Sequence, residues 1–261
     1  MRATDFELFD NGVRQRLDSV SIEIVPVDVI LALDLSESVS GERLDSLVRA
    51  YRAVLDALRP TDRTAVLTFS HEILERVPLS HERDRVLTAL KGFSAGGSTS
   101  LYDAAYVGLR LGDATQARPL LLVFSDGTDS SSWLSAAEVL ESALRSEVVA
   151  YAVVAQSSVG ERPVDALMRE PQRSRLRRPE AGSRAELHEF LQQLTRSTGG
   201  RLLRAKEREL PTNFVEILRE FQNRYLLTYT PQDSEKPGWH DIALRVKRRG
   251  AMVLARRGYW R

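Results

Sequence analysis

The stretch Val29-Ile-Leu-Ala-Leu-Asp-Leu-Ser-Glu-Ser-Val-Ser40 decides the fold, because a run of apolar residues leads directly into closely spaced oxygen side chains. Asp34, Ser36 and Ser38 supply a carboxylate and two hydroxyls where a buried strand turns into a helix. Hard oxygen donors of this kind suit Mg²⁺, which binds oxygen at about 2.0–2.1 Å and keeps part of its water. The same residues also fit a simpler interpretation, in which Asp34 ends a strand and Ser38 or Ser40 caps a helix.

Two later segments favour the metal-site interpretation. Residues 96–104, Gly-Gly-Ser-Thr-Ser-Leu-Tyr-Asp-Ala, place Thr99 in a glycine-rich loop that enters a helix. Residues 120–129, Leu-Leu-Leu-Val-Phe-Ser-Asp-Gly-Thr-Asp, place Asp126 at the end of another apolar run. In a parallel α/β sheet the carboxyl ends of the strands lie along one edge, so loops that follow different strands meet at one crevice. The three segments therefore predict a single oxygen-rich site.

Helical and strand-like segments alternate from residue 27 to about 221, which predicts an α/β fold. The sheet should be doubly wound, six-stranded and mostly parallel, with one antiparallel edge strand formed by a hairpin at His71-Glu72. Strands are expected at residues 29–34, 64–70, 73–79, 120–125 and 148–155. Helices are expected at 44–58, 86–90, 101–111, 134–144, opened by the capping box Ser135-Ala-Ala-Glu138, and 187–194, capped by Ser183.

The two ends of the chain have a different pattern, in which apolar and polar residues alternate. Asn11-Gly12 lies between two such segments and predicts a tight hairpin turn. Further strands are expected at residues 21–25, 225–230, 240–247 and 252–256. Lone hairpins are marginally stable in water, so both ends should pair into one small antiparallel β unit. The predicted parts of the chain are residues 1–24, 25–221 and 222–261.

On these segments the chain resembles the von Willebrand factor type A domain and its metal-ion-dependent adhesion site. The motif positions of that site are filled here by Asp34, Ser36, Ser38, Thr99 and Asp126. The resemblance implies that the three hydroxyls would ligate Mg²⁺ directly, with Mn²⁺ or Ca²⁺ as alternatives, and that the two carboxylates would act partly through water. It also implies that the ion receives an Asp or Glu carboxylate of a partner protein.

Three acidic residues near the motif need separate interpretation. Glu37 stands where the family commonly has glycine, and its carboxylate should alter the rim of the site. Asp103 and Asp129 are not core motif positions, so we expect them to cap helices and support the ligands instead of binding the ion.

The end segments narrow the resemblance to the bacterial von Willebrand factor A-related proteins abundant in Acidobacteria. It rests on the opening Phe-Asp-Asn-Gly, on Tyr225-Leu-Leu-Thr-Tyr229, on the strand that begins at Trp239, and on Arg257-Gly-Tyr259. Such proteins typically carry export signals, so a location outside the cytoplasm is expected. The sequence shows neither an apolar signal core at its start nor the roughly 20 apolar residues that cross a bilayer, so the cytoplasm stays an alternative.

Composition argues against several kinds of catalysis. The 261 residues include no cysteine, which excludes disulfides, thiolate nucleophiles and cysteine-based zinc sites. Histidine occurs singly at positions 71, 81, 188 and 240, and neither H-E-x-x-H, G-x-S-x-G nor a phosphate-binding loop is present. We therefore expect a binding module and no enzyme. The alternative is a metal-assisted hydrolase with Glu37 or Asp129 as the base.

Two basic segments raise nucleic acid as a further alternative. The formal net charge of +1 gives it no general support. The C-terminal basic cluster consists of Arg245, Lys247, Arg248, Arg249, Arg256 and Arg257. Alternate residues of a strand share one face, so this cluster is more simply the solvated side of a hairpin. Residues 157–184 hold seven arginines with interleaved acidic residues, which favours a long recognition loop or a disordered one over a nucleic-acid site.

Overall fold

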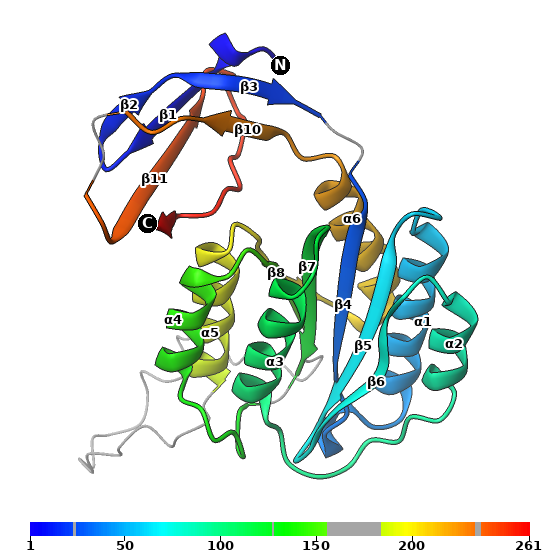
Figure 1. Ribbon diagram of the computed structural model, residues 1–261. Coiled ribbons are helices and arrows are strands. Elements are labelled where there is room, and N and C mark those ends of the chain that lie inside the picture. The colour runs from blue at the N-terminus through cyan, green and yellow to red at the C-terminus, as the bar shows by residue number, and fades with distance from the viewer. Residues whose placement is uncertain (23–24, 127, 156–183, 233–235) are drawn as a thin grey trace, which may run out of the picture.

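The central element of the protein is a six-stranded sheet with strand order β6-β5-β4-β7-β8-β9 (Figure 1). The computed structural model describes residues 1–22, 25–126, 128–155, 184–232 and 236–261. Only β6 runs antiparallel, on the edge beside β5, and the other strands pair in parallel. The predicted fold class is therefore confirmed. The strands are β4 (Val27–Asp34), β5 (Arg63–Phe69), β6 (Ile73–Ser80), β7 (Arg118–Ser125), β8 (Val149–Ala155) and β9 (Leu202–Ala205).

Helices cover both faces of this sheet (Figure 1). One face packs against α1 (Glu42–Ala57), α2 (Arg83–Leu90) and α6 (Leu210–Gln222), and the other against α3 (Leu101–Asp113), α4 (Ala136–Arg145) and α5 (Arg184–Ser197). Because both faces are covered, every residue of β4 is buried, as expected for a nearly continuous apolar strand in a parallel sheet.

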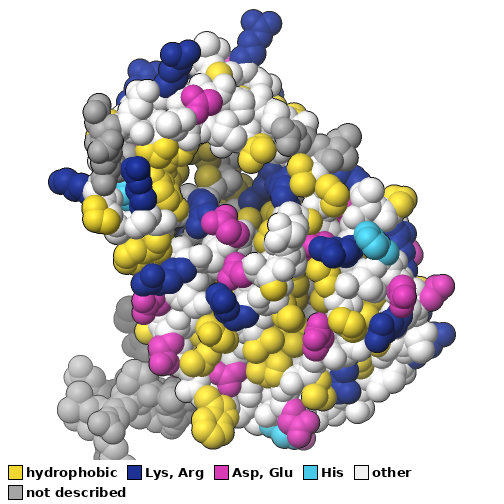
Figure 2. Space-filling view, in the orientation of Figure 1, with side chains coloured by type: hydrophobic (Ala, Val, Ile, Leu, Met, Phe, Trp, Pro, Cys, Tyr) yellow, Lys and Arg dark blue, Asp and Glu magenta, His cyan; other side chains and the backbone are white. Residues whose placement is uncertain are grey.

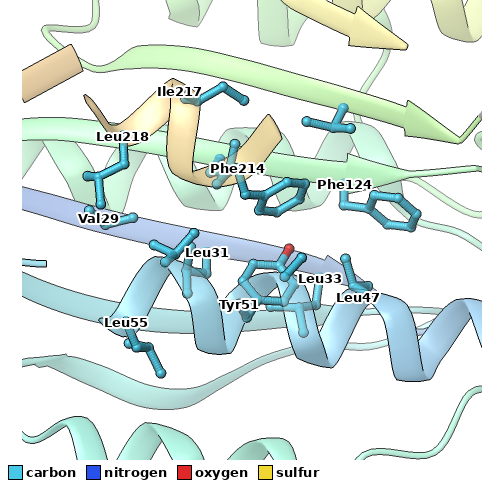
Figure 3. Packing of buried hydrophobic residues seen from close by; sticks show 14 of the residues in the cluster. Val29, Leu31, Leu33, Leu47, Tyr51, Leu55, Phe124, Phe214, Ile217 and Leu218 are labelled. Atoms are coloured by element: carbon cyan, nitrogen blue, oxygen red, sulfur yellow. The ribbon is translucent and has the colours of Figure 1, made fainter. Parts of the chain in front are cut away.

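The packing between β4, α1 and α6 is tight around Tyr51 (Figure 3). The ring of Tyr51 meets that of Phe214 edge-on, with centroids 5.3 Å apart, and its hydroxyl donates a hydrogen bond to the Ala32 carbonyl at 3.2 Å. Leu31 and Phe124 belong to the same cluster. Each such side chain contributes about 1.5–3 kcal/mol by leaving water. This core therefore holds the carboxyl ends of β4 and β7 in fixed positions.

The ends of the chain pair with each other, as predicted, but they form two sheets instead of one. One has the order β12-β11-β1-β2 and the other pairs β10 with β3, all antiparallel. Lysine and arginine side chains stand on the outer surface of this part of the molecule (Figure 2). Asn11 and Gly12 have positive φ, as the tight turn between β1 and β2 requires. The strands are β1 (Phe6–Asp10), β2 (Val13–Gln15), β3 (Leu17–Ser21), β10 (Leu226–Tyr229), β11 (Trp239–Val246) and β12 (Gly258–Trp260).

A buried polar cluster joins the strands of this terminal β unit. His240 and Asp10 are fully buried, with Nδ1 of the imidazole 2.9 Å from Oδ1 of the carboxylate. The other imidazole nitrogen lies 2.7 Å from the carbonyl of Lys236, and the hydroxyls of Tyr229 and Tyr259 donate to Oδ2 of Asp10. The bond to Asp10 raises the pKa of His240. Burial acts to raise the pKa of Asp10, but the bonds from its partners outweigh burial and lower it.

Two predicted terminal strands are wrong in position. The strand expected at 21–25 lies earlier, as β3, because β10 pairs with residues up to Ser21; residues 23 and 24 lie outside the described ranges. Residues 252–256 form no strand. They pass against the turn after α5, where a side chain at Gly199 would meet the Arg256 nitrogen at 2.6 Å. Arg256 also pairs with Glu147 at 2.8 Å, so this segment is drawn away from β11.

Two elements of the main layer were not located from the sequence, namely β9 and α6. The cap predicted at Ser183 and nearly all of the arginine-rich segment 157–184 lie outside the described residues. The capping box at Ser135 is confirmed. The Ser135 hydroxyl accepts from the Glu138 nitrogen, and the Glu138 carboxylate accepts from the Ser135 nitrogen. In the described ranges, none of the helices has the length and apolar character that crossing a membrane demands. The division at residues 24 and 221 stays a prediction.

Candidate metal centre

Asp34, the last residue of β4, lies buried beneath the candidate site. Its Oδ1 accepts a hydrogen bond from the Ser36 nitrogen at 2.9 Å, and its Oδ2 accepts one from the Ser125 hydroxyl at 2.7 Å. Burial raises the pKa of Asp34 from 3.8 to about 6, and the two serines only partly oppose this effect. Burial thus disfavours the ionised form of Asp34, and a cation beside the carboxylate would stabilise that form.

The hydroxyls of Ser36 and Ser38 follow immediately and lie 3.1 Å apart. The Ser38 hydroxyl in turn donates to Oδ1 of Asp126 at 2.7 Å. Asp126 lies beside them because β4 and β7 are neighbours in the sheet, with Leu33 opposite Phe124. For an octahedral ion with bonds of about 2.0–2.1 Å, adjacent ligand oxygens lie roughly 2.9 Å apart. The spacing of these oxygens therefore fits a small divalent cation.

Thr99 lies in a loop that is hydrogen-bonded to the first motif. The Gly96 nitrogen donates to the Leu35 carbonyl at 2.7 Å, and the Glu37 nitrogen donates to the Gly97 carbonyl at 3.1 Å. Gly97 has a φ of +84°, which glycine adopts without steric cost. Thr99 is buried, but in the described part of the chain no hydrogen bond joins its hydroxyl to the other four motif residues. The structure thus links four of the five predicted residues directly and Thr99 through its loop.

Asp103 and Asp129 serve as acceptors for backbone groups, the kind of role predicted for them. The carboxylate of Asp129 accepts from the Tyr102 nitrogen in the first turn of α3, at 3.2 Å, and from the Ser132 hydroxyl. Asp103 accepts from the nitrogens of Trp133 and Leu134, each at 2.9 Å. Asp129, one of the two residues considered as the base of a hydrolase, is therefore already engaged in hydrogen bonds that hold a loop. Glu37 is exposed in the short helix η2 (Glu37–Val39).

Arg43 is a further residue of the site that the sequence did not indicate. From the first turn of α1, its Nη1 donates to Oδ2 of Asp126 and to the Ser38 carbonyl, the latter at 3.0 Å. Its Nε donates to Oε1 of Glu207 at 3.0 Å. Burial acts to lower the pKa of Arg43, but Asp126 and Glu207 more than offset it, and the pKa stands above its ordinary value. No motif spacing marks this arginine, because its acidic partners lie far away in the chain.

The donor set determines what the centre could hold. Within the described ranges, no group of three or more His, Asp or Glu side chains is placed to bind a metal. A cation at this edge of the sheet would therefore depend on serine and threonine hydroxyls together with Asp34 and Asp126. Such a set of hard oxygens suits Mg²⁺, Mn²⁺ or Ca²⁺ and does not suit a soft transition metal.

Comparison with protein families decides the classification. Residues 29–128, which contain all five motif positions, match the profile of the von Willebrand factor type A domain. The chain contains a von Willebrand factor type A domain. A comparison with curated protein sequences finds no match.

Several solved structures share this fold at low sequence identity. A von Willebrand factor type A protein from Catenulispora acidiphila has a TM-score of 0.58 and 19% identity, covering 81% of this chain, which spans only 48% of that protein. The protein BatB from Bacteroides thetaiotaomicron has a TM-score of 0.56 and 15% identity, covering 76% of this chain and 100% of its own. The corresponding domain of the type V pilus tip protein Mfa5 from Porphyromonas gingivalis has a TM-score of 0.58 and 11% identity, with coverages of 77% and 98%.

Proposed function

We propose that the von Willebrand factor type A domain of this chain binds Mg²⁺, or alternatively Mn²⁺ or Ca²⁺, and thereby binds an acidic side chain of a partner protein. The observation that carries the proposal is a row of oxygens at the edge of the sheet where the strands end: the hydroxyls of Ser36 and Ser38 and the carboxylate of Asp126 are joined by hydrogen bonds, and Asp34 accepts from the Ser36 backbone nitrogen beside them. The family match over residues 29–128 supports the same proposal.

The chemistry of the row explains why a partner carboxylate would bind. The hydroxyls of Ser36, Ser38 and Thr99 are neutral ligands, whereas Asp34 and Asp126 are already engaged in hydrogen bonds to their neighbours. A divalent ion held mainly by neutral oxygens keeps much of its positive charge and attracts an anionic ligand to its open side. Asp34 and Asp126 would orient the hydroxyls and bound water, which the hydrogen bonds already present favour.

Trp133 offers a second contact for the same partner. This residue is 97% exposed, although tryptophan is mostly buried in folded proteins. Hydrogen bonds tie the loop that carries it to its neighbours, since the nitrogens of Ser130 and Ser131 donate to the Thr99 carbonyl and the nitrogen of Trp133 donates to the Asp103 carboxylate. Tryptophan is enriched among the residues that dominate binding energies. A partner with an apolar side chain close to its acidic one therefore suits this surface.

The location of the protein follows from the same proposal. The structural neighbours include a domain of a pilus tip protein and the proximal thread matrix protein 1 of the mussel byssus, the latter with a TM-score of 0.58 and 12% identity. The names of these two proteins refer to a pilus tip and to a thread matrix. We infer a location outside the cytoplasm for this chain too, where an adhesive or assembling module meets its partner.

Metal titration and partner capture together test the proposal. Calorimetry with Mg²⁺ and Mn²⁺ should show one site in the wild type and none in the Ser36→Ala/Ser38→Ala double variant. Ser19→Ala is the matched control, since its exposed hydroxyl bonds Thr228 in the terminal β unit. Capture of proteins from an envelope fraction of the source should depend on Mg²⁺ and be lost with chelator. Metal-independent capture of the same partner would contradict the proposal.

Trp133→Ala separates the two contacts. The variant should bind Mg²⁺ with unchanged affinity and capture the partner at least about fivefold more weakly, because an interface tryptophan often contributes more than 1 kcal/mol. A loss of metal affinity in this variant would instead mean that the tryptophan supports the fold of the loop.

Catalysis is tested directly. Purified protein with Mg²⁺ or Mn²⁺ should not turn over generic phosphoester or ester substrates. Metal-dependent hydrolysis that is lost in Glu37→Gln would overturn the binding proposal in favour of a hydrolase.

A further inference from the structure

Arg43 connects the candidate metal centre to a second acidic residue on another element. Its guanidinium bonds Asp126, which follows β7, and Glu207 in the short helix η4 (Glu207–Glu209) just before α6. The three side chains differ in exposure: Asp126 is 4% exposed, Arg43 25% and Glu207 33%. The positive charge thus sits between a nearly buried carboxylate and one that reaches solvent.

Both oxygens of Asp126 are engaged in this arrangement. Oδ1 accepts from the Ser38 hydroxyl, and Oδ2 accepts from Arg43, which also bonds the Ser38 carbonyl. A divalent ion at the row of oxygens would need Ser38 to turn a lone pair toward it and would place a second positive charge beside Arg43. The two positive charges would repel each other, and the ion and Arg43 would compete for the carboxylate of Asp126.

We propose that Arg43 is a built-in cation that competes with the divalent ion, holding Asp126 in the metal-free protein and moving toward Glu207 when the metal binds. This inference rests on the proposed metal binding and adds what sets its affinity. Arg43 stabilises the empty site by neutralising Asp126, and the same contact makes the site bind metal less tightly than its ligands alone would. The guanidinium can make this change without losing all partners, because its Nε already donates to Glu207 while Nη1 bonds Asp126.

Substitutions of Arg43 and of Glu207 should have opposite effects on the affinity for Mg²⁺. In Arg43→Gln the competing charge is gone, so Mg²⁺ should bind at least about tenfold more tightly, the factor expected when a like charge a few ångströms away is removed. In Glu207→Gln the arginine loses its alternative partner, so Mg²⁺ should bind several-fold more weakly. The double variant should resemble Arg43→Gln, because Glu207 acts through the arginine.

Calorimetric titration with Mg²⁺ of the full chain measures all four proteins, with Arg52→Gln as the matched control. Arg52 is an exposed arginine of α1, about 13 Å further along the helix axis at 1.5 Å per residue. Removing it changes the net charge equally without touching the site, so its affinity should stay within about twofold of the wild type.

Thermal melts give a readout that does not depend on the titration. With chelator present, Arg43→Gln should melt below the wild type, because Asp126 is left buried without a cation. With saturating Mg²⁺ the difference should shrink or reverse.

The outcomes separate the inference from the proposed function. If the wild type binds Mg²⁺ and Arg43→Gln binds it equally or more weakly, the competition is refuted while metal binding stands. If the wild type binds none but Arg43→Gln does, the competition is supported in its strongest form. If none of the proteins binds Mg²⁺, both the inference and the metal-binding proposal are overturned.

Discussion

Asp34→Asn should make the metal-free protein more stable at neutral pH, although it removes a central residue of the site. Asp34 is fully buried, and its pKa rises from 3.8 to about 6. A difference of roughly 2 pKa units corresponds to about 3 kcal/mol, by which ionisation of Asp34 disfavours the folded state above pH 6. Asparagine has the same shape as the protonated acid and no charge. The Ser125 hydroxyl, which donates to Asp34, can accept from the amide instead.

The sign of the pH dependence follows from the raised pKa. Well below pH 3.8 both folded and unfolded chains carry a protonated Asp34, so its burial does not lower the free energy of unfolding. Between pH 4 and 6 the unfolded chain releases its proton while the folded one keeps it, and the free energy of unfolding falls as pH rises. The advantage of Asp34→Asn should therefore be about 1 kcal/mol at pH 4.5 and about 3 kcal/mol at pH 7.5.

Thermal melts with chelator at these two pH values measure the effect. For a chain of this size about 3 kcal/mol corresponds to a rise in Tm of roughly 6–12 °C at pH 7.5. Asp56→Asn, which removes an exposed carboxylate of α1, is the control and should shift Tm little at either pH. Mg²⁺ at about 100 times its Kd should stabilise the wild type by about 2.7 kcal/mol and leave Asp34→Asn unchanged. A Tm of Asp34→Asn below the wild type at pH 7.5 without metal would refute the reasoning.

Three further predictions concern the rest of the molecule. The terminal β unit should lose stability as pH rises through the pKa of His240, which is raised above 6.5, and as pH falls through the pKa of Asp10, which is lowered below 3.8. In thermal melts across pH 3–9, His240→Gln should reduce the loss of Tm on the alkaline side. Gly200→Ala should cost several kcal/mol in urea denaturation, because its Cβ would lie 1.9 Å from the Ala150 oxygen, whereas Gly92→Ala, with 3.8 Å to its nearest neighbour, should be nearly neutral. Phe214→Ala should cost about 3–5 kcal/mol by the same assay, and a loss below 1 kcal/mol would mean that α6 is not part of the cooperative core.

The central sheet could be predicted because its strands carry a strong local signal. β4 and β7 are nearly continuous apolar runs, a pattern produced by burial on both faces. Four of the five predicted site residues also come together, since Asp34 ends β4 and Asp126 directly follows the neighbouring parallel strand β7. β9 was missed because it has four residues and mixed burial. α6 does carry a local helical signal, since Leu210, Phe214 and Ile217 recur at helical spacing.

Features that depend on distant contacts could not be predicted. Arg43 gains its role from Asp126 and Glu207, which lie 83 and 164 residues further along the chain. In the same way, the alternating pattern around residues 252–256 predicts a strand, but the close approach to Gly199 and the pair with Glu147 decide otherwise. Local patterns establish which elements form, and only the packed structure establishes which side chains meet.

The most direct test of the metal centre is anomalous diffraction from a crystal of the protein grown with Mn²⁺. One strong peak is expected at bonding distance from the hydroxyls of Ser36, Ser38 and Thr99, with Asp34 and Asp126 behind them and the Arg43 guanidinium moved toward Glu207. The absence of a peak at this edge of the sheet at millimolar Mn²⁺, with Arg43 still bonded to Asp126, would contradict this expectation.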